Sequence, residues 1–414
     1  MRPLRLISIL CIPLLASCSI LGLRKQVGTL EKYGAATLVI SPPPAGPAPT
    51  YALAWTFENG ERKESAGFQR LRADGIASMG LRADRLYRIG AFTDENDNGK
   101  YDAGEPLAVV KDVKPAVLSE PGAKPAIFTV TLKRDRTLPA GTVIAIPKAN
   151  AQLGAKLGVA LGDVVLLDDK RFAPDAGGSG LWKPVEFLTK NTMGIYFTEP
   201  YDPKRIPVVL VYGIGGSPQD WRYFAEHFDR RRYQVWFYHY PSGMRLERVA
   251  RTLATGLRML RQRHGFAHCD VVAHSMGGLV SHAAIRGAAE GVNFIPRFVT
   301  ISTPWGGHAA AEQGIRHLKN PVPSWLDVAP GSDFLAVLHA TPLPSGTRHD
   351  MIYGSVKGGP FYLKGENDGV VTVASETDAR IAKRAASVTH FPCGHVEILG
   401  RGDTLAKVFA LLGK

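Results

Sequence analysis

The sequence predicts an α/β fold, with a mostly parallel sheet flanked by helices, preceded by a small all-β domain that resembles a sandwich. Three observations lead to this prediction. From Ile206 onward, strand-like runs alternate with helical patterns, which is typical of a parallel sheet. Between Ala35 and about Lys133, short strand-like runs are separated by turn signals. The chain has 414 residues, which is too long for one ordinary core, so two domains are expected.

Residues 1–17 are predicted to be a signal peptide rather than part of the fold. Two arginines precede an apolar run, Leu6–Leu15, which is too short to cross a bilayer. The following Leu15-Ala-Ser-Cys18 resembles the lipobox of bacterial lipoproteins, which implies that Cys18 is lipidated and becomes the first mature residue. Because Ser19 is not aspartate, the resemblance favours the outer membrane of a bacterial cell envelope. The alternative is an ordinary secretory signal with an incidental cysteine.

The rest of the chain divides into a tether and three further segments. Residues 18–34 are interpreted as the tether, and residues 35–133 as the β domain. Its strands are expected at residues 36–40, 51–57, 86–92, 107–113 and 126–132. Residues 134–205 show no regular pattern and are interpreted as a connector that packs on the α/β domain. The glycine-rich stretch Pro174–Gly180 is expected to be the loosest piece of that connector.

The α/β domain is expected to span residues 206–414. Leucine and valine recur at helical spacing from Leu246 to Leu260, with arginines mostly off that face, which predicts an amphipathic helix. Buried strands are expected at residues 207–212, 233–238, 269–273, 298–302, 351–353 and 387–390.

The segment Asp270–Gly278 is the most informative stretch of the chain. It reads as a buried strand, a sharp turn with Ser275 at its tip and the start of a helix, which is the pattern of a nucleophile elbow. A serine hydroxyl is a weak nucleophile and must stand clear of the sheet to meet both a base and a substrate. The strained turn requires small residues on either side, and Ala273 and Gly277 meet that requirement. Ser275 is therefore predicted to be the nucleophile.

A glycine-rich loop, Val211–Ser217, follows the first clear strand of the α/β domain. Glycines let the backbone turn its N–H groups toward a developing negative charge, as an oxyanion hole requires. One donor is expected from this loop. The other is expected from Met276, the residue after the nucleophile.

The acid and the histidine of a catalytic triad are expected after the nucleophile, in that order. Asp368 lies in an Asp-Gly turn after the strand at residues 351–353, and His395 lies in a loop after the last strand. Such a carboxylate would hold the imidazole in the correct tautomer and stabilise its cation. Rival residues are weaker candidates: Asp350, at the wrong end of the sheet, Glu366, Asp378, His390, within a strand, and His274, which is expected to point away from the base.

Five motifs together resemble the α/β-hydrolase family. They are Ala273-His-Ser-Met-Gly-Gly278, Tyr212-Gly-Ile-Gly-Gly216, Ser302-Thr-Pro-Trp-Gly-Gly307, Asn367-Asp-Gly-Val-Val371 and Gly394-His395. Within the family they are similar to bacterial lipases whose elbow also begins with alanine, and the resemblance covers residues 206–414, about half the chain. It implies an acyl hydrolase whose oxyanion amides belong to Ile214 and Met276. Such lipases usually have His-Gly where this chain has Tyr212-Gly213, so the support of the loop is expected to differ.

A long insertion lies between Trp305 and Arg348, before the next strand. A lid or acyl-binding cap is one interpretation of this segment, and ordinary core is the other. Its apolar residues include Trp325, Leu326, Val328, Phe334, Leu335, Val337 and Leu338.

A second motif lies in the β domain, where Asp94–Glu105 matches the pattern D-x-[DN]-x-[DN]-G-x5-E in full. Oxygen ligands at alternating positions and a glycine at the bend suit Ca²⁺. Because the flanks look like strands rather than helices, the alternative is a polar hairpin turn held by its own hydrogen bonds. Catalysis is expected to need no cofactor. The candidate ligands of a structural calcium ion are Asp94, Asn96, Asn98, Asp102 and Glu105.

The formal net charge of +13 does not point to nucleic acid, because basic residues are interleaved with acids and form no stripe with aromatic residues. A solvated basic face is the main interpretation, and attraction to an anionic membrane surface is the alternative. Cys269 and Cys393 are expected at different heights along the sheet, too far apart for a disulfide, so both should be free thiols.

The sequence thus predicts a serine hydrolase of the lipase/esterase kind that cleaves carboxylic esters through an acyl-enzyme. Its partners would be an acyl-ester substrate, either a lipid or a small ester, and a bacterial membrane reached through lipidated Cys18. A thioesterase, an acyltransferase or an amidase with the same triad remains open, as does a catalytically idle surface-binding lipoprotein.

Overall fold

The structure is a computed structural model that describes most of the chain after the predicted tether. The predicted signal peptide, Cys18 and most of the tether lie outside the described residues. Among the described helices, none is both long and apolar enough to span a lipid bilayer. The described residues are 26, 28–29, 32–58, 61–71, 75–115, 126–138, 144–145, 159–289, 291–318, 321–360 and 363–413.

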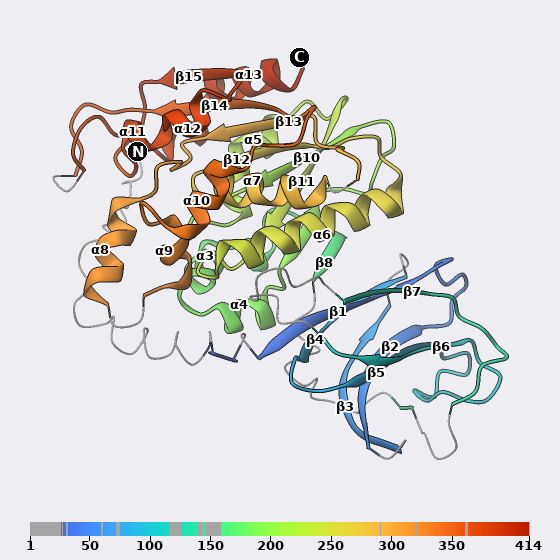
Figure 1. Ribbon diagram of the computed structural model, residues 1–414. Coiled ribbons are helices and arrows are strands. Elements are labelled where there is room, and N and C mark those ends of the chain that lie inside the picture. The colour runs from blue at the N-terminus through green and yellow to red at the C-terminus, as the bar shows by residue number, and fades with distance from the viewer. Residues whose placement is uncertain are drawn as a thin grey trace.

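Two small sheets form the first part of the described chain, shown in blue and teal in Figure 1. One has the order β4-β1-β7 and the other β3-β2-β5-β6, and only the β1–β7 pair is parallel. Their facing side chains form one hydrophobic cluster, as a sandwich requires. The strands are β1 (Tyr33–Ile40), β2 (Thr50–Glu58), β3 (Glu61–Arg70), β4 (Ile76–Arg82), β5 (Tyr87–Thr93), β6 (Leu107–Val113) and β7 (Ala126–Val130).

The sequence reading missed β3 and β4. β3 is rich in charged residues, and β4 is buried at nearly every position, so neither strand shows a clear alternation of apolar and polar residues. Pairing with neighbouring strands makes them strands, and that information is not local in the sequence.

An eight-stranded sheet forms the second part, with the order β15-β14-β13-β12-β10-β11-β9-β8. The strands from β10 to β15 run parallel to one another, whereas β9 is antiparallel to β11. This is the predicted, mostly parallel sheet. Its strands are β8 (Ala160–Val164), β9 (Gly194–Phe197), β10 (Ile206–Val211), β11 (Tyr233–His239), β12 (Asp270–His274), β13 (Arg297–Ile301), β14 (Arg348–Gly354) and β15 (Ser387–Phe391).

The interpretation of residues 134–205 as a patternless connector needs correction. β8 and β9 lie in this segment and form one edge of the large sheet, so the α/β part begins near residue 160 rather than 206. The stretch Pro174–Gly180, expected to be loose, lies in helix α3 (Pro174–Trp182). Short strands that rely on edge pairing, and a helix rich in glycine, carry weak local signals.

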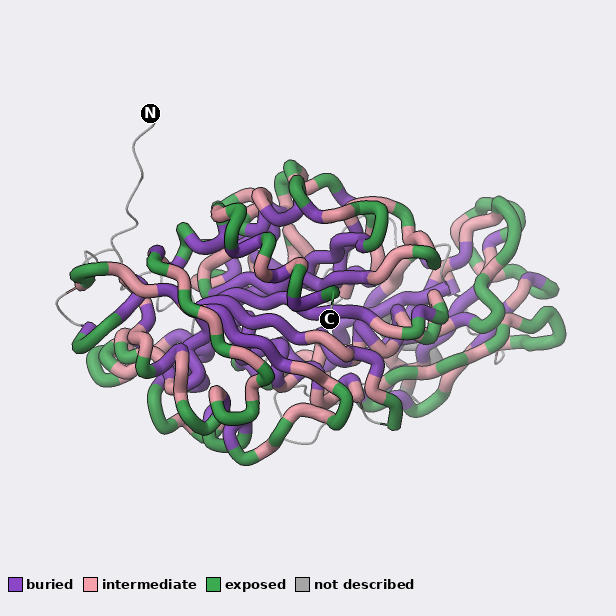
Figure 2. The backbone as a smooth tube through the Cα atoms, turned by 90° about the horizontal axis from the view of Figure 1, so that it is seen from above, coloured by how far each residue is buried: buried purple, intermediate pink, exposed green. Residues whose placement is uncertain are grey.

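Helices cover both faces of the large sheet. In Figure 1, α6 and α7 lie in front of the strands, whereas α5 lies behind them. Figure 2 shows buried residues along the strands and exposed residues mainly at the rim. The remaining helices are α4 (Pro184–Lys190), α5 (Arg222–His227), α6 (Leu246–His264), α7 (Met276–Ala288), α8 (Ala309–His317), α9 (Pro323–Val328), α10 (Asp333–Ala340), α11 (Val373–Glu376), α12 (Ala379–Ala382) and α13 (Gly402–Leu412).

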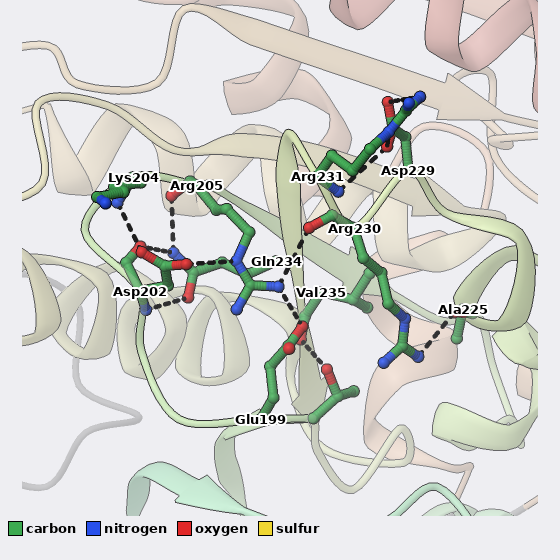
Figure 3. Close-up of polar contacts among 11 residues, drawn as sticks. Glu199, Asp202, Lys204, Arg205, Ala225, Asp229, Arg230, Arg231, Gln234 and Val235 are labelled. Atoms are coloured by element: carbon green, nitrogen blue, oxygen red, sulfur yellow. Dashed lines mark hydrogen bonds and ion pairs between the residues drawn. The ribbon is translucent and has the colours of Figure 1, made fainter.

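A polar network ties the turn before β10 to the start of β11, at the amino-terminal edge of the parallel strands (Figure 3). The Arg205 guanidinium contacts Glu199 and Asp202, each at 2.9 Å. The Gln234 side-chain amide donates to the carbonyls of Asp202 and Arg205 at 2.8 and 2.7 Å. Because buried polar groups are satisfied here, the register of the central strands is well defined at this edge.

Cys269 and Cys393 are both free and buried, as expected from their positions on the sheet.

Candidate active site

The predicted nucleophile elbow lies between β12 and α7. Ser275 has φ 53° and ψ −132°, a conformation rarely adopted by residues other than glycine. Such backbone strain costs about 1–3 kcal/mol and persists only where the surroundings impose it. Here the Ser275 N–H donates to the Ile301 carbonyl at 2.8 Å, and the Ser275 carbonyl accepts from the Gly278 N–H at 2.9 Å. The serine is thereby held at the carboxyl end of β12.

Close backbone packing explains why small residues surround the serine. A Cβ atom at position 277 would lie 2.4 Å from the Tyr212 carbonyl oxygen, and one at position 278 would lie 2.0 Å from Thr303 Oγ1. A Cβ atom at position 213 would lie 2.8 Å from Ser275 Cβ. These separations are too short for any side chain, so the elbow and the loop after β10 can meet only through glycines.

Asp368 and His395 form a buried pair beside the elbow. His395 Nδ1 is hydrogen-bonded to Asp368 Oδ2, and the His395 N–H donates to the Asp368 carbonyl at 2.9 Å. Asp368 Oδ1 accepts from the N–H groups of Val370 and Val371 at 2.9 and 2.7 Å. Burial raises the pKa of Asp368, but the charge of His395 and these hydrogen bonds outweigh it, so the pKa lies below its ordinary value.

The structure places the rival acids away from His395 or gives them other partners. Asp350 is buried in β14 and bonded to Arg348 and Ser387. Asp378 accepts from Arg380, and Glu366 is exposed. His390 contacts Ser355 Oγ at 2.7 Å.

His274 links the elbow to the His395 loop. Its Nε2 lies 2.8 Å from the His395 carbonyl oxygen, and the two imidazole rings are 4.7 Å apart. Burial first, and then the charge of His395, lowers the pKa of His274 to about 3, so this ring is neutral near pH 7. Because His274 directly precedes Ser275, this contact links the turn that carries Ser275 to the loop that carries His395.

The loop after β10 contains Ile214, whose N–H the sequence predicts as an oxyanion donor. The Gly215 N–H donates to Ser242 Oγ at 2.9 Å, and the Gly216 N–H donates to the Gly213 carbonyl at 3.3 Å. Neither bond uses the Ile214 N–H, and the role of Ile214 as an oxyanion donor stays a prediction. Met276 is the first residue of α7, where helix N–H groups have no partner within the helix. The Ile214 side chain is partly exposed.

Tyr212 occupies the place where the similar lipases carry histidine, and it supports the loop through its hydroxyl. The Tyr212 hydroxyl donates to the Tyr240 carbonyl at 2.5 Å and accepts from the Tyr240 N–H at 2.6 Å. In return, the Tyr240 hydroxyl donates to the Tyr212 carbonyl at 2.6 Å, and the two rings stack 4.6 Å apart. The sequence showed the departure at position 212 but not this partner.

Helix α3 also packs against the loop after β10. A Cβ atom at Gly177 would lie 2.2 Å from the Gly215 carbonyl oxygen and 2.7 Å from that of Gly216. The stretch that the sequence suggested was loose therefore packs directly on the oxyanion loop.

The insertion between β13 and β14 forms α8, α9 and α10, and part of it is core. Val328, Leu335 and Leu338 are buried, whereas Leu326 and Val337 are exposed. Asp327 in α9 holds the segment to α6, because it accepts from the Arg245 guanidinium and from the Leu246 N–H at 2.7 Å. The sequence suggested either a cap or core. The helix α9 is anchored, and the role of the segment in substrate binding stays a prediction.

A pocket of about 260 Å³ lies next to the Asp368 turn. Its lining includes His308 from the insertion, Val370 and Val371 from the turn, and Leu363. A larger pocket of about 470 Å³ lies at the opposite edge of the sheet, near Arg258, Arg261 and Phe294. We associate the smaller pocket with the site because it adjoins the Asp–His pair.

Among the described residues, one group of carboxylate and imidazole donors is close enough to hold a metal ion: Asp368, Glu376 and His395. Asp368 and His395 are already bonded to each other, and their backbone hydrogen bonds suit a catalytic pair better than a metal site. Sequence reasoning missed Glu376 and its neighbour Ser302, because nothing local in the chain indicates that Glu376 approaches Asp368 or that Ser302 approaches Glu376.

The Asp94–Glu105 loop is held by its own hydrogen bonds. Asp94 accepts from the N–H groups of Asn98 and Gly99 at 3.0 and 2.8 Å. Glu105 accepts from the N–H groups of Glu95 and Asp102 at 2.8 and 2.9 Å. Asp102 accepts from the side-chain amides of Asn96 and Asn98. This is the arrangement of the hairpin alternative, and calcium binding stays a prediction.

Comparisons with known proteins bear on the second part of the chain. Residues 206–336 match the family model described as the alpha/beta hydrolase fold. No curated protein matches the sequence. Similar solved structures include a gene product of Listeria innocua, with 17% identity, covering 51% of this chain and 94% of that one, at a TM-score of 0.39.

Two further solved structures are similar at the same low level. Aspergillus fumigatus lipase B has 15% identity, covering 49% of each chain, at a TM-score of 0.37. A structure described in work on carboxylesterases of Nitrososphaera gargenis has 16% identity, covering 53% of this chain and 94% of that one, at a TM-score of 0.35. The family match and the strand order together show that the part of the chain built on the eight-stranded sheet has the α/β-hydrolase fold.

Proposed function

We propose that this protein is a serine hydrolase that cleaves carboxylic esters, with Ser275 as nucleophile, His395 as base and Asp368 as the acid that orients the histidine. The observation that carries the proposal is the strained serine at a strand-to-helix turn, whose preceding residue, His274, contacts the loop of a buried His–Asp pair. The α/β-hydrolase fold supports hydrolytic activity in general. The ester substrate is part of the proposal.

In the first half of the proposed reaction, Nε2 of His395 accepts the Ser275 proton while Oγ attacks the carbonyl carbon of the ester. The carbonyl oxygen becomes an oxyanion, to which the N–H groups of Ile214 and Met276 donate. The tetrahedral intermediate then collapses. The proton passes from His395 to the leaving alcohol, and the acyl group stays on Ser275.

In the second half, water attacks the acyl-enzyme and gives its proton to His395. The second tetrahedral intermediate releases the carboxylic acid, and the proton returns to Ser275. Asp368 remains ionised throughout and stabilises the imidazolium. A thioester, an amide or an acceptor other than water would follow the same steps, so thioesterase, amidase and acyltransferase activities are the alternatives to be separated by substrate choice.

Labelling with a fluorophosphonate probe tests the nucleophile, and p-nitrophenyl esters of graded chain length test the substrate class. We expect the wild type to be labelled and to hydrolyse esters. Ser275→Ala should lose both properties while keeping its melting temperature. Labelling of the Ser275→Ala variant at the wild-type rate would remove Ser275 from the site. A wild type that is neither labelled nor active would favour the idle binding lipoprotein.

We further propose that lipidated Cys18 anchors the protein at the bacterial cell envelope, with the outer membrane as the expected location. Each buried methylene of an acyl chain contributes about 0.8 kcal/mol, so several chains together anchor stably. Cys18→Ser should leave the protein unprocessed or released from membranes. A variant that is processed and sediments with membranes as before would contradict the anchor without affecting the proposed chemistry.

A further inference from the structure

Glu376 is a buried carboxyl group that the triad does not use. It is the last residue of α11, with 1% of its surface exposed. One of its carboxylate oxygens, an oxygen of Asp368 and a ring nitrogen of His395 all lie within 4.8 Å of one another. Both carboxylate oxygens of Glu376 are buried without a hydrogen-bond partner among the described residues. A buried ionised carboxylate without partners is costly, so its protonation state needs explanation.

The surroundings favour a charge on Asp368 and not on Glu376. Asp368 accepts hydrogen bonds from Val370, Val371 and His395, all of which stabilise its ionised form. Glu376 has a weaker set of donors: the Ser302 hydroxyl and the Gly354 N–H lower its pKa, but by less than burial raises it. Burial first, and then the charge of Asp368, raises the pKa of Glu376 to about 10. Two adjacent buried carboxyl groups cannot both ionise at low cost, so the group with the weaker set of donors keeps its proton.

We propose that Glu376 is a positioning residue: a neutral carboxylic acid that donates its proton in a hydrogen bond to the Asp368 carboxylate and so fixes that carboxylate for His395. This inference rests on the proposed function, because it gives Asp368 its role toward His395. It assigns Glu376 no contact with the substrate. Glu376 keeps its proton throughout the reaction.

Ser302 completes the arrangement on the other side of Glu376. Its hydroxyl is buried without a hydrogen-bond partner among the described residues, and it lies close enough to act on the Glu376 carboxyl group. Ser302 also has a positive φ of 49°, so the backbone after β13 is constrained to present this residue here. A protonated Glu376 can donate to Asp368 and accept from Ser302. Both buried groups would then be satisfied by a small adjustment.

If Glu376 is neutral, the ionised groups close to the site are Asp368 and, during the reaction, protonated His395. When His395 takes the serine proton, one negative charge, on Asp368, faces the imidazolium. The neighbouring imidazoles carry no charge near pH 7, because burial lowers the pKa of His274 to about 3 and that of His308 to about 4. Further along, Asp378 is paired with Arg380 and also interacts with His339.

The activity test compares Glu376→Ala and Glu376→Gln with a control, Asp350→Asn. Asp350 is also a buried carboxyl group of the α/β part, but it is bonded to Arg348 and Ser387 away from the triad. Glu376→Ala should lower kcat about 10- to 100-fold, the rate equivalent of one hydrogen bond to a charged group, with little change in KM. Glu376→Gln keeps a donor and an acceptor and should recover most of this loss. Asp350→Asn should leave kcat unchanged.

Two activity results would overturn the proposal. One is a normal kcat in Glu376→Ala, and the other is a Glu376→Gln variant as impaired as Glu376→Ala. The pH–rate profile gives a readout that general damage to the fold would not mimic. Replacing a neutral acid by glutamine should leave the acidic limb of kcat/KM where it is. If Glu376 were ionised, the same change would remove a negative charge near the imidazolium and move the limb to lower pH.

A melting experiment tests the protonation state without relying on activity. If the pKa of Glu376 is 4.5 in the unfolded chain and about 10 in the folded protein, folding takes up a proton between those values. Wild type should then lose stability relative to Glu376→Gln as pH rises from about 5 to about 9. A melting-temperature difference that stays flat with pH would overturn the proposal. A wild type without hydrolase activity would instead defeat the proposed function, and this measurement would still decide the state of Glu376.

Discussion

Two pairs of buried carboxyl groups, one in each part of the chain, differ in the hydrogen bonds that they receive. In the β part, Asp94 and Glu105 each accept two backbone N–H groups from their own loop. In the α/β part, Asp368 accepts such bonds, but its neighbour Glu376 has no hydrogen-bond partner among the described residues. Burial is similar in both pairs, so the supply of donors distinguishes them: both carboxyl groups of the β-part loop accept backbone N–H groups, whereas in the α/β part Asp368 is far better supplied than Glu376.

The two pairs also differ in how far along the chain their partners lie. The β-part loop closes on itself within Asp94–Glu105. In the candidate active site, Ser275 follows β12, Asp368 and Glu376 follow β14, and His395 follows β15. A local arrangement can form and be satisfied alone, whereas a dispersed one depends on the whole sheet.

The sharpest comparison makes the same substitution in both regions. Asp368→Asn should reduce kcat about 10⁴-fold, because the amide no longer holds the histidine in the right tautomer. Asp94→Asn should leave kcat unchanged, since that carboxylate accepts its hydrogen bonds within its own loop in the β part. Steady-state ester hydrolysis measures both. Equal loss of activity in the two variants would show that the Asp94 loop affects catalysis, contrary to this prediction.

Acid should unfold the α/β part before the β part. All 12 histidines lie after residue 226. Burial, as the leading cause, lowers the pKa of His239, His274, His282 and His349 to about 3 each. Below pH 6.5 the unfolded chain binds protons that these folded residues do not, so stability falls as pH drops toward 3.

Each of these histidines can contribute a loss of up to about 1.4 kcal/mol per pH unit in that window. Limited proteolysis at decreasing pH, with the fragments identified by mass spectrometry, would show which part opens first. Earlier cleavage within the two small sheets would contradict the expectation.

Helix α3 allows a matched pair of substitutions that tests the support of the oxyanion loop. Gly177→Ala would place a Cβ atom 2.2 Å from the Gly215 carbonyl oxygen, whereas a Cβ atom at Gly178 would meet nothing within 4 Å. Displacing an oxyanion donor costs about 10²–10³-fold in kcat, and we expect Gly177→Ala to approach the lower value. Gly178→Ala should behave like wild type. Equal kcat values for both variants would mean that α3 does not position the loop.

Adding calcium tests whether the loop in the β part binds a metal ion. If Asp94–Glu105 binds Ca²⁺, the ion should raise the melting temperature of the protein and leave kcat unchanged. Binding stabilises the native state by about 2.7 kcal/mol at a hundredfold excess over Kd. Asp94→Ala should remove the response to calcium. Identical melting curves in calcium and in chelator would leave the loop as a self-satisfied turn.

Much of the α/β part could be predicted from local patterns. Apolar runs predicted strands β10 to β15, and apolar residues at helical spacing predicted helix α6, because each of these elements buries a continuous face. Asp270–Gly278 indicated the elbow because a strained turn tolerates only small neighbours, and Ser275 has the backbone conformation that such a turn requires. The candidate acid and histidine could be selected by their order after recognised strands.

Other features depended on contacts between segments that are distant in sequence. β3, β8 and β9 are strands because of their neighbours in the sheets, and α3 supports the oxyanion loop because glycine lets two backbones meet. The approach of Glu376 to Asp368 has no local signal. The sequence by itself determined which residues could carry the chemistry, since composition and spacing act locally. Only the tertiary structure decided which buried groups lack partners, since hydrogen-bond supply and desolvation depend on every segment that packs around a residue.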